Sequence, residues 1–255
     1  MCILFIARNQ SKQYPLIVAA NRDEFHKRPT LSSHLWNTTP TLVAGKDQEG
    51  GGTWMGVTTS GKIAALTNVR DPSSMKPTAP SRGDLTCNWL LGTDDIATYQ
   101  QQLKQRKDEY NGYNLVFGDE NELWVYNNTT DDFYPLTDGI FGLSNADIHT
   151  SWPKTARGEA RMNDIVSMSS VNHDLLFDML NDQQQAAYNQ LPETGVGLEW
   201  EKRLSSIFIT SPEYGTRSST LLLVDQQGVM HWSERTFNSE GKQTNEQTFA
   251  LDSRV

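Results

Sequence analysis

The sequence predicts an α+β fold built from antiparallel sheets that are covered by helices. Short runs of β-branched and apolar residues, separated by polar or glycine-containing turns, recur at the start, in the middle and at the end of the chain. Two stretches with helical spacing lie between these β regions and do not alternate with single strands. Such segregation is typical of layered α+β proteins. A sandwich of two sheets between helical layers fits the count, as do other α+β arrangements.

The first third of the chain is mainly β and is followed by two helices. Its predicted strands are residues 2–7, 16–20, 54–59 and 63–67. A Ser-Gly step between the last two strands indicates a hairpin turn. Apolar residues at helical spacing then predict one helix around residues 85–90 and another over residues 96–103, the second preceded by a Thr-Asp-Asp capping signal.

The same pattern of strands followed by helices continues to the end of the chain. The predicted elements are strands at 114–118, 122–126, 133–136 and 140–144, helices at 155–168 and 173–180, and strands at 207–210, 220–224, 229–234 and 247–251. No internal repeat or low-complexity linker divides them. We therefore predict one domain over residues 1–255.

Charge and hydropathy exclude several classes of protein. The chain has 22 lysines and arginines against 31 aspartates and glutamates, so its formal net charge of −9 argues against a nucleic-acid partner. Its apolar opening is interrupted at Arg8, and no later run approaches the roughly 18 apolar residues of a membrane span. Cys2 and Cys87 are the only cysteines, which fits a reducing compartment. These features predict a cytoplasmic protein without an integral membrane segment.

Cys2 is the most informative single position. Removal of the initiator methionine would leave a cysteine with a free α-amine, whose pKa lies at about 7.7 to 8.0 in model compounds. A neutral amine can accept the thiol proton, so nucleophile and base would belong to one residue and need no cofactor. The alternative is that Cys2 simply begins a buried strand, because free cysteine is often buried.

Three charged residues in a row end the second predicted strand, in the segment Asn-Arg-Asp-Glu-Phe at residues 21–25. Arg22 could favour the thiolate of a neighbouring cysteine, and Asp23 could hold an α-amine by a charge-assisted hydrogen bond. The alternative is a solvated turn. Elsewhere, Trp54, Met55 and Trp36 could line the mouth of a pocket for a flat hydrophobic ligand, or could be ordinary core residues.

A set of motifs in conserved order resembles a known family. They are MCILFIA at the start, NRDEF at residues 21–25 followed by Arg28-Pro29, GGTWMGV at 51–57, ALTNVR at 65–70, GLSN at 142–145 and YGTRSST at 214–220. Together these resemble the transport and Golgi organisation 2 family, also called the NRDE family. The resemblance extends from residue 2 to the last strands.

This resemblance implies a four-layer αββα sandwich similar to the N-terminal-nucleophile hydrolases. By analogy with the cysteine-type acylases of that superfamily, it implies that Cys2 is the nucleophile and that Arg22 and Asp23 activate it. Asn68 and Asn145 would then be oxyanion donors, which can contribute about 3 kcal/mol each. Arg217 would be an orienting cation.

The resemblance also implies haem trafficking, because the family is associated with that role. We therefore expect a protein that carries haem, or a similar flat amphipathic ligand, to a haem-accepting partner. The candidate axial ligands are the seven methionines and His26, His34, His149, His173 and His231; no CxxCH attachment motif is present. The alternatives are a Cys2-dependent hydrolase of small linear amides or acyl compounds, and an acyl-metabolite or lipid binder without turnover.

Overall fold

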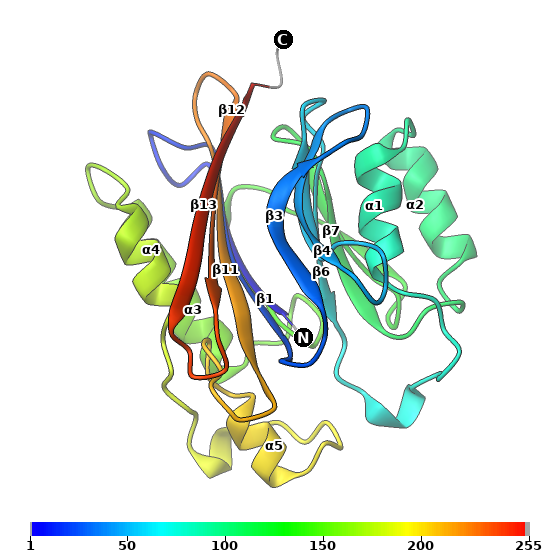
Figure 1. Ribbon diagram of the computed structural model, residues 1–255, viewed down its shortest axis with the longest axis vertical. Helices are drawn as coiled ribbons and strands as arrows, with labels where there is room; N and C mark the ends of the chain where they lie inside the picture. The colour runs from blue at the N-terminus through cyan, green and yellow to red at the C-terminus, as the bar shows by residue number, and fades with distance from the viewer. Residues whose placement is uncertain (1, 253–255) are drawn as a thin grey trace.

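The computed structural model describes residues 2–252, which form two antiparallel sheets packed face to face between two helical layers (Figure 1). Within that range, one sheet has six strands in the order β10-β1-β2-β11-β12-β13, and the other has seven strands in the order β3 to β9. Helices α3 and α4 cover the outer face of the six-stranded sheet, and α1 and α2 cover that of the seven-stranded sheet. The predicted α+β class and αββα layer order are confirmed.

The six-stranded sheet is buried on both faces, which explains its continuous apolar runs. Its strands are β1 (Cys2–Arg8), β2 (Leu16–Phe25), β10 (Gly139–Leu143), β11 (Tyr214–Val224), β12 (Val229–Phe237) and β13 (Gln243–Asp252). Along β1, Leu4 and Ile6 face the space between the sheets, whereas Ile3 and Phe5 pack against the helical layer. Side chains alternate between the faces of a strand, so burial on both sides requires apolar residues at successive positions.

The seven-stranded sheet begins with two strands that the sequence did not predict. Its strands are β3 (Thr30–Trp36), β4 (Leu42–Asp47), β5 (Met55–Thr58), β6 (Ile63–Asn68), β7 (Tyr113–Gly118), β8 (Leu123–Asn127) and β9 (Asp132–Pro135). β3 lies at the edge of the sheet and mixes exposed and half-buried residues, so its sequence lacks a clear apolar pattern.

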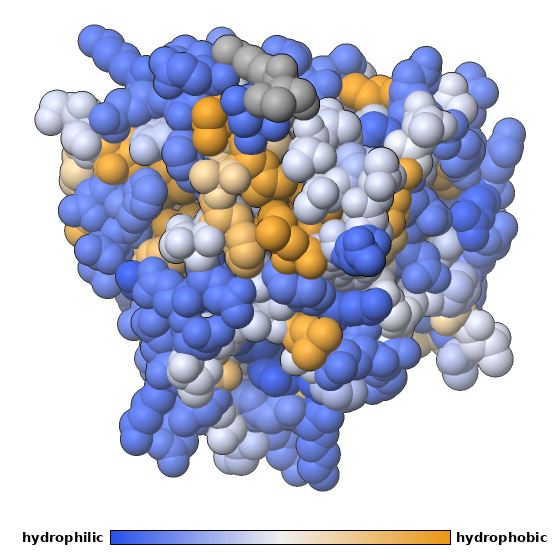
Figure 2. All heavy atoms as spheres, turned by 45° about the horizontal axis from the view of Figure 1, so that its top comes forward, coloured by the Kyte–Doolittle hydropathy of each residue, from blue (hydrophilic) through white to orange (hydrophobic). Residues whose placement is uncertain are grey.

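Five α-helices occur among residues 2–252. They are α1 (Gly83–Leu91), α2 (Ile96–Gln105), α3 (Pro153–Val166), α4 (His173–Leu180) and α5 (Leu198–Arg203). α1 and α2 bury Leu85, Trp89 and Tyr99 against the seven-stranded sheet, as the helical spacing predicted. No helix in the described range has both the length and the hydropathy to cross a bilayer. When the top of the molecule in Figure 1 is tilted toward the viewer, the visible surface is mostly hydrophilic, and apolar residues gather near the middle of this face (Figure 2).

One predicted strand is wrong. Residues 207–210 are buried but not extended in a sheet, because their backbone groups are satisfied by other partners. The carbonyl of Ile207 accepts a hydrogen bond from the Asn21 side chain, and the N–H of Phe208 donates to the carbonyl of Asp182. The N–H of Ile209 donates to the hydroxyl of Thr216. Apolar composition indicated burial at this segment but did not indicate its conformation.

We predict that Gly158→Ala destabilises the protein. A Cβ atom at this position of α3 would lie 2.1 Å from Cζ of Phe5, a fully buried ring that cannot move away. The overpacking should cost about 1–3 kcal/mol of unfolding free energy, in spite of a gain of about 1 kcal/mol in helix propensity. Urea unfolding measures the change, with Arg161→Ala on the exposed side of the same helix as control. Equal or higher stability of the alanine variant would contradict the close packing.

Candidate active site

The pairing of β1 with β2 places Cys2 beside Arg22. The two residues are directly opposite each other in this antiparallel pair, and Arg22 is in turn paired with Ser218 of β11. Cys2 and Arg22 are each two positions from a core residue that faces between the sheets, Leu4 on β1 and Ala20 on β2, so their side chains lie on that same face. The thiol and the guanidinium therefore reach the same end of the inter-sheet space.

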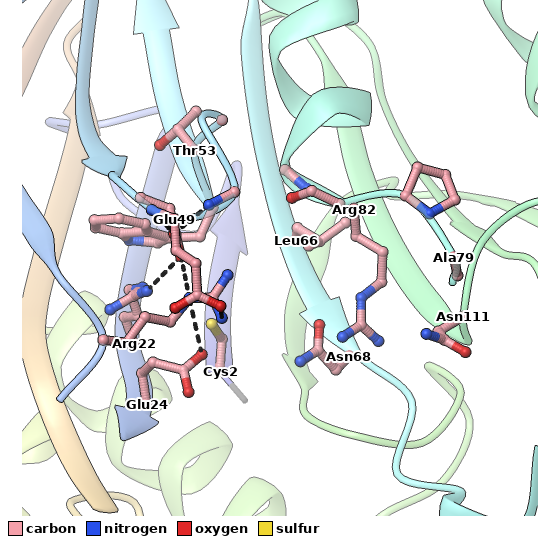
Figure 3. A pocket seen from close by; sticks show the side chains of 18 of the residues that line it. Cys2, Arg22, Glu24, Glu49, Thr53, Leu66, Asn68, Ala79, Arg82 and Asn111 are labelled. Carbon is pink, nitrogen blue, oxygen red and sulfur yellow. Dashed lines mark hydrogen bonds and ion pairs between the residues drawn. The ribbon is translucent and has the colours of Figure 1, made fainter. Parts of the chain in front are cut away.

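A cleft of about 410 Å³ opens at this point, and Cys2 is one of its lining residues. We call it the polar lobe. Figure 3 shows Cys2, Arg22, Glu24 and Glu49 on one wall, facing Arg82 and other residues across the opening. The lining residues used below are Cys2, Arg22, Asp23, Glu24, Arg28, Asp47, Glu49, Trp54, Asn68, Arg82 and Asn111. Cys2 is only 9% exposed, so access to its sulfur is through this cleft.

Arg22 is held by contacts on three sides. Its guanidinium donates to Oδ2 of Asp47 at 3.0 Å and to the hydroxyl of Thr30 at 3.2 Å. Its Cζ lies 4.3 Å from the ring centroid of Trp54, within the range of a cation–π contact. The segment predicted as a strand end or a solvated turn is therefore part of β2, with Arg22 5% exposed.

Asp23 is buried on the other face of β2, toward the helical layer. The hydroxyl of Thr216 donates to its carboxylate at 2.7 Å, and the hydroxyl of Tyr214 donates to its backbone carbonyl at 3.0 Å. Burial raises the pKa of Asp23, and the charge of Lys154 on α3 acts in the opposite direction. Burial and the charge of Arg70 in turn lower the pKa of Lys154 to about 7. The charges of Asp23 and Lys154 thus act on each other on the side of the six-stranded sheet that faces the helical layer.

Burial also raises the pKa of the Cys2 thiol, and the charge of Asp23 adds to that effect, while Arg22 opposes it. A thiol with a raised pKa is protonated at neutral pH and requires a base to become a nucleophile. The predicted base is the α-amine that removal of Met1 would expose. Met1 lies outside the described residues.

The two predicted oxyanion donors are hydrogen-bonded to each other but lie in different environments. Asn68, at the end of β6, lines the cleft and faces the opening (Figure 3). Asn145 is 1% exposed and does not line the cleft; its amide donates to the carbonyls of Asn68 at 2.9 Å and Cys2 at 3.4 Å. In this structure Asn145 is a positioning residue that ties the nucleophile strand to the opposite sheet.

Arg217 lies outside the cleft. It is at a β-bulge between Thr216 and Ser218, and its guanidinium donates to the backbone carbonyls of Phe25, His26 and Arg28. These bonds fix the chain that leaves β2. Its predicted role as an orienting cation remains a prediction, and the contacts seen support the turn that carries Arg28.

The three predicted pocket residues have different positions. Trp54 lines the polar lobe beneath Arg22. Met55 is 1% exposed and belongs to the core between the sheets, so the core alternative describes it. Trp36 lies on the edge strand β3, where its indole N–H donates to the carbonyl of Ala44 and its ring contacts Lys46. Among the described residues, Trp36 lines neither the polar lobe nor the lobe beside it.

Sequence reasoning missed Asp47 and Arg82 and gave Arg28 no role. Asp47 accepts hydrogen bonds from Arg28 at 2.6 Å and Arg22 at 3.0 Å, so one carboxylate orients two arginines. Arg82, at the start of α1, faces Cys2 across the cleft (Figure 3). Arg28 belongs to a quoted motif, but Asp47 and Arg82 follow no recognisable spacing.

A second cavity of about 580 Å³ adjoins the polar lobe, and we call it the apolar lobe. It shares Glu24, Arg28, Asn68, Arg82 and Asn111 with the polar lobe. The rest of its wall is mostly apolar and comes from β2, the segment after β6, and the region around α5. These residues include Phe25, Val69, Pro72, Met75, Val196, Trp200, Leu204 and Tyr214. The two lobes form one continuous cleft with a polar and an apolar half.

A family model described as Transport and Golgi organisation 2 matches residues 1–239. The chain belongs to this family. Its relatives include the Transport and Golgi organization 2 homolog of Mus musculus, which is 32% identical and is matched over 99% of this chain and 100% of the mouse protein. The Homo sapiens homolog is 34% identical over 92% of this chain and 93% of the human one.

Solved structures that superpose on this chain at low sequence identity include two hydrolytic enzymes. Penicillin V acylase from Agrobacterium tumefaciens superposes with a TM-score of 0.55 at 12% identity, over 99% of this chain and 88% of that chain. A mutant of the conjugated bile acid hydrolase from Clostridium perfringens gives 0.53 at 8% identity, over 99% and 92%. These likenesses show the fold, which is that of the N-terminal-nucleophile hydrolases.

We predict that Asp47→Asn lowers stability at neutral pH. Burial alone would raise the pKa of Asp47, but hydrogen bonds from Arg28 and the Gly50 N–H, with the charges of Arg28 and Arg22, hold it below its ordinary value. A depressed carboxyl pKa stabilises the fold above the unfolded pKa of about 3.9 and loses that contribution as pH falls through the folded value. The variant should lose about 2 kcal/mol at pH 7.

The measurement is urea unfolding of both proteins from pH 7 to pH 3. The difference between them should shrink in the acidic range, because protonated Asp47 no longer pairs with the arginines. Asp132→Asn, at an exposed strand position, is the control and should leave stability unchanged. A difference that persists at the lowest pH would show that the carboxylate charge is not what orients Arg22 and Arg28.

Proposed function

We propose that this protein hydrolyses a C–N bond of a small linear amide, with Cys2 as the nucleophile. The observation that carries the proposal is the position of Cys2: its sulfur opens into the polar lobe beside Arg22, with a buried carboxylate, Asp23, on the neighbouring strand position. The rest of the polar lobe is lined by residues from several distant segments, among them Trp54, Asn68 and Arg82. Such convergence in a cleft is what a reaction at a fixed nucleophile requires.

In the proposed reaction the α-amine of Cys2, freed by loss of Met1, accepts the thiol proton. The thiolate attacks the amide carbonyl, and Asn68 donates a hydrogen bond to the oxyanion. The protonated amine then gives its proton to the leaving nitrogen, the C–N bond breaks, and an acyl thioester remains on Cys2. The same amine, again neutral, takes a proton from water, which attacks the thioester and releases the acid and the thiol.

Asp23 and Arg22 would act on this sequence through charge. The charge of the Asp23 carboxylate on the neighbouring strand would favour the protonated amine after the first transfer, and the guanidinium of Arg22 would favour the thiolate. Arg22 is itself immobilised by Asp47 and Trp54, so little reorganisation is needed when the thiolate forms. Asn145 would contribute by holding the backbone of Cys2.

We predict that Cys2→Ala abolishes hydrolysis of a panel of N-acyl amides, whereas Cys87→Ala retains it. Cys87 is partly buried on α1 and lines neither lobe. Released amine is quantified by mass spectrometry, and intact mass of the cell-made protein shows whether Met1 is removed. Full retention of Met1, or equal turnover by the Cys2 variant and the unmodified protein, would exclude the mechanism.

A second candidate function is the carriage of haem, and the apolar lobe favours it. This lobe has room for a flat apolar ligand, and Met75, which is 63% exposed, lies on its wall. Arg82 also lines it and could pair with a propionate. None of the histidines lines either lobe within residues 2–252, so Met75 is the candidate axial ligand. Delivery to a haem-accepting protein would follow from such binding.

We predict that, if haem is carried there, titration gives a saturable Soret shift that Met75→Leu weakens several-fold. Met168→Leu is the matched control, since Met168 is 44% exposed and lies outside both lobes. A non-saturating response, like that of an inert protein, would reject haem carriage. Binding of an acyl ligand to Cys2→Ala with no turnover by the unmodified protein would instead support a lipid or acyl-metabolite binder.

A further inference from the structure

The residues shared by the two lobes determine which ligands can occupy both of them. Any ligand that spans both lobes must place a polar or charged part near Cys2 and an apolar part near Trp200 and Leu204. Three arginines line the polar lobe: Arg22 and Arg82 face each other across it (Figure 3), and Arg28 shares the carboxylate of Asp47 with Arg22. These arginines differ in whether a protein carboxylate already pairs with them.

Arg22 and Arg28 are already neutralised by protein carboxylates. Both pair with Asp47, at 3.0 and 2.6 Å, and Arg28 also pairs with Glu49 at 3.1 Å. An anionic ligand would have to compete with these ion pairs. Their geometry indicates a structural task, which is to shape the wall around Cys2.

Arg82 has no such partner. Its guanidinium donates to the backbone carbonyl of Gly112 at 3.0 Å, and no carboxylate among residues 2–252 forms an ion pair with it. Glu24, the acidic residue that lines both lobes, lies on the opposite wall and accepts a hydrogen bond from the N–H of Phe25. The charge of Glu24 reaches Arg82 only from across the cleft, without an ion pair. A partly buried cation that faces a cleft without an ion-pair partner is suited to binding an anion.

The surroundings of Arg82 hold it in place. It occupies the cap position of α1, and its bond to Gly112 fixes the guanidinium toward the junction between the two lobes. The adjoining segment is tied down by Asn111, whose side chain bonds both the N–H and the carbonyl of Lys76. A guanidinium that is immobilised before binding loses little conformational entropy when it meets a ligand.

The apolar lobe beyond Arg82 supplies the second half of the recognition. Phe25 and Met75 on its wall are 49% and 63% exposed, so both present apolar surface that a ligand in this lobe would cover. A chain of several methylene groups placed there would gain about 0.8 kcal/mol for each one buried. The cleft thus combines one unpaired cation with one apolar surface.

We propose that Arg82 binds the single carboxylate of an amphiphilic N-acyl amino acid, whose acyl chain occupies the apolar lobe. Such a compound has an apolar tail, one amide and one carboxylate within a few bonds of that amide. This assignment rests on the proposed function for the fate of the amide, and on the cleft alone for binding. Arg82 is then a specificity-determining residue and takes no part in bond breaking.

The test uses the full chain carrying Cys2→Ala, so that binding is measured without turnover. Isothermal titration calorimetry compares N-decanoylglycine with its neutral counterpart, N-decanoylglycinamide. The anionic compound should bind at least about tenfold more tightly, as expected for one charge-assisted hydrogen-bonded pair. This preference should fall as ionic strength rises.

Arg82→Gln, added to the same variant, should remove the preference and leave both compounds with similar affinities, and Arg82→Lys should retain part of it. Arg161→Gln removes one positive charge from an exposed position of α3 and should change neither affinity. Circular dichroism confirms that each variant is folded. If the glutamine variant does not fold, the lysine variant and the salt dependence decide.

Equal affinity for the charged and the neutral compound, absence of binding by either, or an unchanged preference in Arg82→Gln would overturn the proposal. Selective binding by the Cys2→Ala protein together with no turnover by the unmodified protein would refute the hydrolase and leave this inference intact. Hydrolysis of both compounds at equal efficiency, without selective binding, would support the hydrolase and refute the role of Arg82.

Discussion

The site depends on the register between β1 and β2. Side chains alternate along a strand, so the pairing of Cys2 with Arg22 sends both toward the space between the sheets. A slip of one residue would turn the thiol toward the helical layer and would also move Leu4 and Ile6 out of the inter-sheet core. Burial of the apolar residues of β1 on both faces therefore fixes the position of the nucleophile. The register that buries the core residues of β1 is therefore the same register that places Cys2 in the site.

The bulge in β11 has a comparable effect on Asp23. Regular pairing beyond Ser218 would place Arg217 opposite Asp23, but the irregularity places Thr216 there and excludes Arg217 from the ladder. The hydroxyl of Thr216 can then donate to the buried carboxylate at 2.7 Å. The displaced guanidinium caps the carbonyls at the end of β2. Bulges of this kind commonly redirect side chains near sites, and here one bulge positions both Thr216 and Arg217.

The sequence predicted most of the fold because its strands and helices carry strong periodic patterns. The grouping of Cys2 with Arg22 and Asp23 came from the resemblance to the family, and the pairing of β1 with β2 places Cys2 opposite Arg22. Prediction failed where partners lie far apart or the pattern is weak: the edge strand β3 has no apolar alternation, and residues 207–210 are buried without being a strand. Asp47 and Arg82 become recognisable only when separate elements meet at the cleft. A β-bulge has no recognisable pattern of residues in the sequence, so the position of Arg217 could not be predicted either.

A buried network connects the wall of the apolar lobe to the backbone of the nucleophile. Glu201 of α5 forms an ion pair with Arg70 at 2.6 Å, both side chains being 3% exposed, and Arg70 also donates to the side chain of Asn145. Asn145 in turn donates to the carbonyl of Cys2. Breaking a buried ion pair by removing one partner typically costs about 3–5 kcal/mol, so α5 and the nucleophile strand are held in one arrangement. The two lobes of the cleft are thus fixed relative to each other by polar contacts that neither lobe exposes to a ligand.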